Sequence, residues 1–123
     1  MRRAAPIMIP IALAILAGCS LGPSTGPDTS EPLVRIDAPV AQDTVGSNVN
    51  ISVTAVDDIG VDSVRILIDG ALLVREFSPP FIAAWNTQGV TNNANHAIRA
   101  EAFDRAGNKG VDQITVWVAR GPQ

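Results

Sequence analysis

Apolar residues recur at every second position in several segments after residue 32, and this alternation constrains the fold more than any other feature of the chain. Val49, Ile51 and Val53 alternate with the polar residues Asn50 and Ser52. Since successive side chains of a strand point to opposite faces, a period of two predicts half-buried β-strands. Residue choice agrees, because residues 19–123 contain 13 Val and 8 Ile but only 5 Leu and one Lys.

The same pattern predicts seven short strands, bounded by turn residues, at 33–36, 49–56, 64–68, 71–77, 81–85, 98–102 and 114–118. Asp69-Gly70 is a strong two-residue hairpin signal, and residues 104–108 predict a second tight turn. Between these strands there is no helical pattern of the length that a parallel crossover needs. The sequence therefore predicts an all-β fold, an antiparallel sandwich of two sheets and about seven strands.

The first eighteen residues have a different composition from the rest. Arg2 and Arg3 supply a positive start, and an uncharged, mostly apolar run follows from residue 4 to residue 17. This run is too short to span a bilayer as a helix, and it contains Pro6 and Pro10. A basic start, a short apolar core and small residues at its end predict an export signal at 1–18, with an uncleaved membrane anchor as the alternative.

Leu16-Ala17-Gly18-Cys19 resembles the lipobox of bacterial lipoproteins. This resemblance implies that the Cys19 thiol receives a diacylglyceryl group and that signal peptidase cuts before it. The chain would then be held to a membrane by its lipid, and Ser20 after the cysteine favours the outer membrane of a diderm host. An ordinary secretory peptide with an incidental cysteine is the alternative. Because Cys19 is the only cysteine, no disulfide can form within the chain.

Residues 19–32 predict a lipidated N-terminus followed by a flexible tether, since Gly, Pro, Ser and Thr dominate this segment. Twelve such residues give a root-mean-square reach of about 19 Å, which keeps the following domain close to the bilayer. Residues 33–120 then form one folded domain.

Several pieces of this domain, in their order and spacing, resemble the bacterial Ig-like domains appended to secreted proteases and glycoside hydrolases. The matching segments are 36–39, 49–58, 64–70, 78–85 and 102–108. The chain departs from the pattern at Gln42-Asp43, where a glycine turn is usual. The resemblance implies an Ig-like sandwich that serves as a spacer, an adhesive or an accessory binding module, and it does not imply catalysis.

The residues argue against an enzyme and against nucleic-acid binding. There is one histidine, His96, which we expect to be a hydrogen-bonded surface residue, and no Gly-x-Ser-x-Gly nucleophile motif or glycine-rich phosphate loop is present. The chain has 9 Lys and Arg against 12 Asp and Glu, a formal charge of −3. A nucleic-acid partner would require a basic domain.

Two acidic loops lie at the same end of the expected sandwich. They carry Asp57, Asp58, Asp104 and Asn108, whose oxygen atoms are of the kind that Ca²⁺ prefers. The alternative is that each Asp caps its own turn, with Asp104 accepting backbone N–H bonds and Gly107 taking a positive φ. Otherwise no cofactor is expected.

The two tryptophans are predicted to face opposite ways. Trp85 shares the parity of core positions, whereas Trp117 is out of phase with the apolar residues of its strand and should point outward. Pairing Ile98 with Val116 would place Arg99 diagonally from Trp117. The predicted outer face then contains a partner-binding set of Trp117, Arg99, Leu67 and Phe103. The alternative is that Arg99 covers the indole through a cation–π contact.

These observations favour a lipid-anchored, non-catalytic binding or adhesion module at the bacterial cell envelope. Its partners would be the membrane, through Cys19, and an envelope protein or a carbohydrate. The alternative is a purely structural or accessory subunit of an envelope complex.

Overall fold

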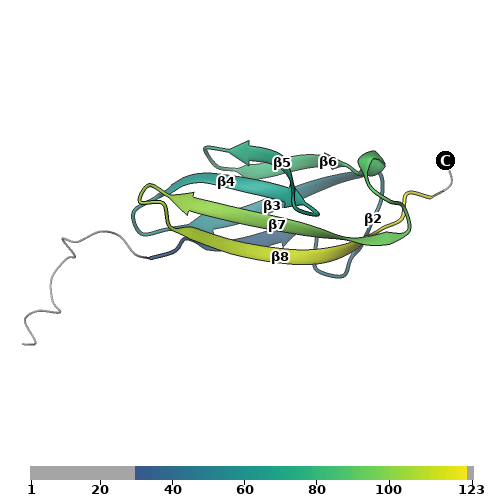
Figure 1. The fold of residues 1–123 in the computed structure, drawn as a ribbon, viewed down its shortest axis with the longest axis horizontal. Coiled ribbons are helices and arrows are strands. Elements are labelled where there is room, and N and C mark those ends of the chain that lie inside the picture. Colours follow the sequence, from purple (N-terminus) through teal and green to yellow (C-terminus); the bar gives the residue numbers. More distant parts are fainter. Residues whose placement is uncertain (1–29, 122–123) are drawn as a thin grey trace, which may run out of the picture.

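The computed structural model describes residues 30–121, which form eight strands in two sheets. The three-stranded sheet has the order β1-β3-β6 and the five-stranded sheet the order β2-β8-β7-β4-β5. Figure 1 shows the two sheets stacked along a common long axis. The strands are β1 (Leu33–Ala38), β2 (Thr44–Val45), β3 (Asn48–Val56), β4 (Val61–Ile68), β5 (Ala71–Glu76), β6 (Phe81–Asn86), β7 (Ala94–Asp104) and β8 (Lys109–Val118).

The core lies between the sheets and is built from the alternating apolar positions. Ile51 of β3, Ile66 of β4 and Ile98 of β7 are fully buried, and Trp85 of β6 is only 3% exposed. The predicted core position of Trp85 is therefore confirmed. Burying such side chains between two sheets supplies the main favourable term for a small domain without disulfides.

The hairpin between β4 and β5 forms at the predicted dipeptide. Asp69 has φ 50° and Gly70 has φ 87°, so both central residues have the positive φ that a type I′ turn requires. The β7–β8 turn is also confirmed, with Gly107 at φ 91°. Strand β7 is longer than the predicted strand 98–102, because it begins at Ala94 and ends at Asp104. Its first residues, Ala94 and Asn95, pair with the end of β8.

The predicted antiparallel sandwich of two sheets is confirmed, and the segment after β1 adds a short strand that was not predicted. It crosses to the other sheet, and there β2 runs parallel to β8, with Thr44 beside Trp117. Backbone bonds hold this edge, including Gln42 N to Thr115 O at 2.7 Å and Trp117 N to Asp43 O at 2.8 Å. Gln42 has φ 72°, the left-handed region that favours glycine, at the very position where the resemblance led us to expect a glycine turn.

The described chain begins and ends at opposite ends of the sandwich (Figure 1). Leu33 pairs with Val56 at the end that carries the β3–β4 loop and the β7–β8 turn. At this end the chain passes so close to β8 that a Cβ on Gly110 would lie 1.9 Å from the Pro32 carbonyl oxygen. Glycine is therefore required at position 110 by lack of space.

Candidate functional site

The outer face of the five-stranded sheet gathers most of the basic side chains of the domain. Register places Arg75 of β5 beside Arg65 of β4, Arg65 beside Glu101 of β7, and Arg99 beside Gln113 of β8. Lys109 of β8 lies next to them, opposite Phe103. Alternation puts all of these side chains on the face that points away from the core. We call Arg65, Arg75, Arg99, Glu101 and Lys109 the basic face.

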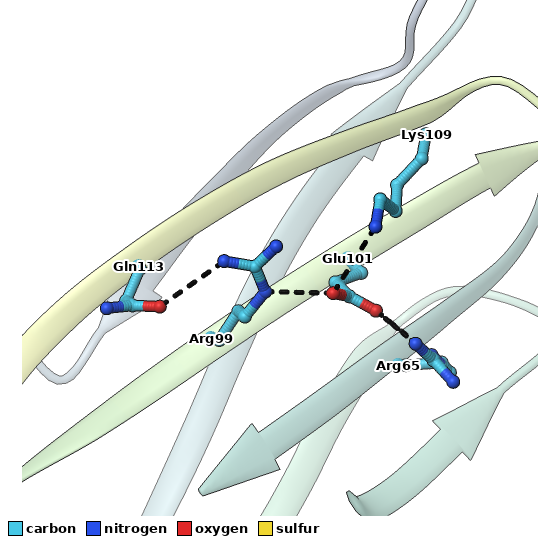
Figure 2. A network of polar contacts seen from close by, with 5 residues as sticks. All are labelled: Arg65, Arg99, Glu101, Lys109 and Gln113. Atoms are coloured by element: carbon cyan, nitrogen blue, oxygen red, sulfur yellow. Dashed lines mark hydrogen bonds and ion pairs between the residues drawn. The ribbon is translucent and has the colours of Figure 1, made fainter. Parts of the chain in front are cut away.

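Glu101 is the centre of the basic face, and its side chain is only 6% exposed. Figure 2 shows Arg65 and Arg99 on either side of this carboxylate. Arg65 donates from Nε and Nη2 to Oε1, and Arg99 donates from Nε to Oε2 at 2.8 Å. Lys109 Nζ lies 3.8 Å from Oε2, and Arg99 also donates to the side-chain oxygen of Gln113. A single buried acid thus fixes two guanidinium groups.

The protonation of Glu101 follows from these contacts. Burial of the carboxylate opposes its charge, but hydrogen bonds from Arg99 and Arg65 and the nearby charges of Arg65 and Lys109 outweigh that effect and lower the pKa of Glu101. Glu101 is therefore ionised at neutral pH. Since the other four residues are cations, the basic face has a net charge of +3 on a chain whose formal charge is −3.

The Phe103 ring contacts two arginines of the basic face. The guanidinium carbons of Arg65 and Arg75 lie 5.4 Å and 5.9 Å from the centre of its ring, within the range of cation–π attraction. The Arg75 guanidinium has no hydrogen bond or ion pair with any other residue of the described chain. Its orientation therefore depends on the Phe103 ring.

Trp117 points outward, as predicted, and is 40% exposed. The expected pairing of Ile98 with Val116 is wrong, because Ile98 pairs with Ile114 and Trp117 pairs with Asn95. A shift of two residues leaves every side chain on its predicted face but moves Trp117 away from Arg99. Arg99 instead bonds Glu101 and Gln113.

The predicted partner-binding set is thus divided. Leu67 lies opposite Arg99, and Phe103 lies toward the β7–β8 turn. Trp117 is separated from Phe103 by eight residues along β7, about 26 Å. The structure brings Leu67 and Arg99 together, with Phe103 and Trp117 each about 13 Å from Arg99 along the strands, in opposite directions.

The acidic loops lie at one end of the sandwich, as expected, and their carboxylates cap turns. Asp57 Oδ2 accepts from the N–H groups of Ile59 and Gly60, whereas its Oδ1 has no partner in the described chain. Asp104 is buried, and its Oδ1 accepts from Ala106 N at 2.9 Å and Asn108 N at 2.8 Å. Asn108 also donates from its side chain to Asp104 Oδ2.

Within residues 30–121 no three His, Cys, Asp or Glu side chains are grouped as metal ligands would be. The calcium site at Asp57, Asp58, Asp104 and Asn108 stays a prediction. The turn-capping alternative accounts for the contacts of Asp57 and Asp104. The lipidation residue Cys19 lies outside the described residues.

His96 is buried, at 8% exposure, where we expected a surface residue. Its Nδ1 lies 2.6 Å from Asp69 Oδ2 and its Nε2 lies 2.7 Å from the Thr91 carbonyl oxygen. The alternation of β7 turns His96 toward the core, and the β4–β5 turn covers it. Both contacts serve structure, since they tie the start of β7 to two neighbouring loops.

The predicted partner-binding set contains one member of the basic face, Arg99, and two of its neighbours, Leu67 and Phe103, but not the buried acid that organises it. A signal for it was present. Arg99 and Glu101 are alternate residues of the predicted strand 98–102, so they share a face, and Arg65 falls on the outward face of the predicted strand 64–68. An acid flanked by arginines on one face predicts an ion-pair network.

The two stacked sheets, their strand order and their outward charged rows define an Ig-like β-sandwich. The bacterial Ig domain family matches residues 32–116, and the chain belongs to this family. Domains of this kind are commonly non-catalytic modules in binding or structure.

Solved structures show the same fold. The fibronectin(III)-like modules of Clostridium thermocellum CbhA are similar over 73% of this chain and 47% of theirs, with 25% identity and a TM-score of 0.62. The endo-β-1,4-mannanase of Thermotoga petrophila matches 79% of this chain with 22% of its own, at 13% identity and a TM-score of 0.63. The PKD1 domain of Vibrio anguillarum Epp matches 76% of this chain over its full length, at 14% identity and a TM-score of 0.58.

The chain therefore spans about half of the CbhA chain and about a fifth of the mannanase. No curated protein matches the sequence significantly. In the part of the chain that the structure describes, no helix has the length and apolar character to cross a membrane.

Proposed function

We propose that this protein is a lipid-anchored, non-catalytic binding module of the bacterial cell envelope, with the basic face as its binding surface. The observation that carries the proposal is the Glu101 carboxylate, buried on an outward face and held between Arg65 and Arg99. Removing a carboxylate from water is costly, and apolar residues in such a place are often as stabilising or more so. Stability alone does not require this arrangement.

The network fixes the orientation of two charged groups, the guanidinium groups of Arg65 and Arg99. Each guanidinium has five N–H donors, and Glu101 and Gln113 accept two from each of Arg65 and Arg99. The remaining donors are available to a partner and are already held in place. Pre-organised groups lose less entropy on binding than mobile ones, so the geometry suits recognition.

Anchoring rests on the lipobox at residues 16–19 and on the place where the domain begins. With acyl chains on Cys19, the tether would enter the sandwich at the Leu33 end, and the opposite end, with Trp117, would point away from the bilayer. The basic face lies along the side of the sandwich and stays accessible. The family membership and the absence of a nucleophile motif support a role without catalysis.

The first experiment tests the anchor. Cells that produce the wild-type chain or Cys19→Ser are labelled with a fatty-acid probe and separated into membrane and soluble fractions. We expect label and membrane association in the wild type, and no label in the variant, which should appear as unprocessed precursor or as soluble protein, because only the thiol accepts the diacylglyceryl group. Label on the Ser variant would contradict lipidation at Cys19.

The second experiment tests the surface in intact cells. A photo-crosslinking amino acid replaces Val111, which is exposed on the basic-face side, or Ile82, which is exposed on the three-stranded sheet. We expect cross-linked adducts from position 111 and none from position 82. Equal yields at both positions, or none at either, would favour the purely structural role instead.

A further inference from the structure

We infer that the basic face binds an extended polysaccharide that carries uronic acid carboxylates. This inference deepens the proposed function, because it names the partner class of the same surface. The first observation behind it is the net charge of the basic face. A face of net charge +3 on an acidic chain attracts an anion locally, while the rest of the surface repels it.

The layout of the cations indicates a polymer. Arg75, Arg65, Arg99 and Lys109 come from four adjacent strands, β5, β4, β7 and β8. By register Arg75 and Arg65 are level with Glu101, whereas Arg99 lies two residues to one side and Lys109 two residues to the other. The four cations therefore span three inter-strand spacings, about 14 Å across the strands, and about 13 Å along them, far more than one small anion covers. A chain with a carboxylate on successive sugar rings would meet several of these cations as it crosses the sheet. Arginine forks match carboxylates in a bidentate geometry.

The charged centre of the basic face argues against a protein as the partner. Protein interfaces have an apolar core from which charged residues are depleted, with charges at the rim. Here the centre is the Arg65–Glu101–Arg99 network, and the exposed aromatic residues lie outside it, Phe77 just after β5 and Trp117 near the end of β8.

The residues around the basic face argue against a bilayer or a nucleic acid as the ligand. The end of the sandwich nearest the tether carries Asp57, Asp58, Asp62 and Asp104 against Arg105 and Lys109, so its net charge is negative and would repel anionic headgroups. Single-stranded nucleic acids need aromatic rings on which bases stack, and the ring of this face, Phe103, already lies against Arg65 and Arg75. A polysaccharide requires neither a flat contact at that end nor a free ring.

Binding is measured with the full chain, purified in mild detergent, on immobilised polygalacturonate, neutral dextran and single-stranded DNA at low ionic strength. We expect saturable binding to polygalacturonate, at least tenfold tighter than to dextran or DNA, which weakens as salt rises. No binding to polygalacturonate, or equal or tighter binding to DNA, would overturn the inference.

Two variants locate the site while keeping the hydrogen bonds from Arg65 and Arg99 to its buried acid. Arg75→Gln removes a guanidinium that has no hydrogen bond, and Lys109→Gln removes the cation 3.8 Å from Glu101. Each is expected to weaken polygalacturonate binding about tenfold, the usual effect of one charged hydrogen bond. Arg35→Gln is the matched control, because Arg35 is an exposed arginine of the other sheet. Melting curves establish that all three variants are folded. An equal loss in Arg35→Gln would overturn the assignment.

Co-sedimentation with lipid vesicles tests whether the basic face binds a membrane instead of a polysaccharide. The full chain with Cys19→Ser, which has no acyl chain of its own, is mixed with phosphatidylglycerol vesicles. Because this variant keeps Arg2, Arg3 and the apolar run 4–17, we expect the same co-sedimentation with and without Arg75→Gln. Co-sedimentation that Arg75→Gln abolishes would assign the face to lipid and overturn the inference. If cells give adducts at position 111 but the purified protein does not bind polygalacturonate, the proposed function stands and only the uronic acid ligand is refuted.

Discussion

His96 Nδ1 lies 2.6 Å from Asp69 Oδ2, and this contact joins the start of β7 to the β4–β5 turn. The other ring nitrogen faces the Thr91 carbonyl oxygen at 2.7 Å. A carboxylate and a carbonyl oxygen are both acceptors, so both ring nitrogens must donate and the imidazole is protonated in this arrangement. The contact is therefore sensitive to pH.

We expect the domain to lose stability as pH rises above neutrality. Burial of His96 opposes its charge and is the largest single effect, and Arg120 opposes it too. The Thr91 carbonyl and the Asp69 carboxylate outweigh them and raise the pKa of His96 above 6.5. Its stabilising contribution is complete below pH 6.5 and is lost as pH passes through the raised pKa. Melting temperatures between pH 6 and pH 9 test this. The decline should flatten in His96→Gln, and an unchanged decline would contradict the assignment to His96.

Gly110→Ala should destabilise the domain by about 1–3 kcal/mol, since the added methyl would overlap the Pro32 carbonyl oxygen and the chain must move. Gly46→Ala is the matched control, because a Cβ there meets nothing within 4 Å and the residue does not have a positive φ. Urea unfolding of both variants gives the comparison. Similar free energies of unfolding for the two would refute the close approach.

The two tryptophans should respond differently to truncation. Trp117→Thr is expected to change the free energy of unfolding by less than about 1 kcal/mol, because the site faces solvent and threonine suits a strand. Trp85→Ala should cost about 3–5 kcal/mol, because it empties a core position. Thermal melts monitored by circular dichroism decide the matter. A large loss in Trp117→Thr would contradict the register of β8.

Asp104→Ala should destabilise the β7–β8 turn by about 2 kcal/mol, since it leaves the N–H groups of Ala106 and Asn108 without their acceptor. If turn capping is the whole role of this carboxylate, millimolar Ca²⁺ will leave the melting temperature of the wild type unchanged. A melting temperature that rises with Ca²⁺ and falls with a chelator would instead support the predicted calcium site.

Gln42→Gly should raise the free energy of unfolding by up to about 1 kcal/mol. The left-handed φ of Gln42 strains a residue that has a Cβ, and glycine relieves that strain at some cost in chain entropy. Chemical denaturation measures the difference. A lower stability would show that the Gln42 side chain has a role that its backbone conformation does not reveal.

The features that the sequence predicted well are those encoded by local pattern. Asp69-Gly70 forms a turn because its two residues accept positive φ, and the alternation around Ile51 and Ile66 identifies the buried faces. Strand β2 was not predictable in this way. It is two residues long, and backbone bonds to β8 hold it, so its side chains carry no period.

The site was harder to predict than the fold, because its central contact is non-local. Glu101 sits at an outward position, where an acid is ordinarily solvated, and cations from β4 and β8 bury it. The predicted register of β7 against β8 differs from the observed one by two residues, because the polar segment that contains Asn95 and His96 lacks the alternation of a strand. His96 is accepted there because Asp69 and Thr91 satisfy both of its nitrogens.

The parallel pairing of β2 with β8 has a mechanical consequence. The described chain enters and leaves at opposite ends of the sandwich, so a force applied to those two ends would pull along the strands. The bonds Gln42 N to Thr115 O, Trp117 N to Asp43 O and Ala119 N to Val45 O lie across that direction. They would be loaded in shear and must break together, whereas bonds in a hairpin pulled from its open end break one at a time. A short edge strand can thus give a small domain resistance to force well beyond its share of the folding free energy.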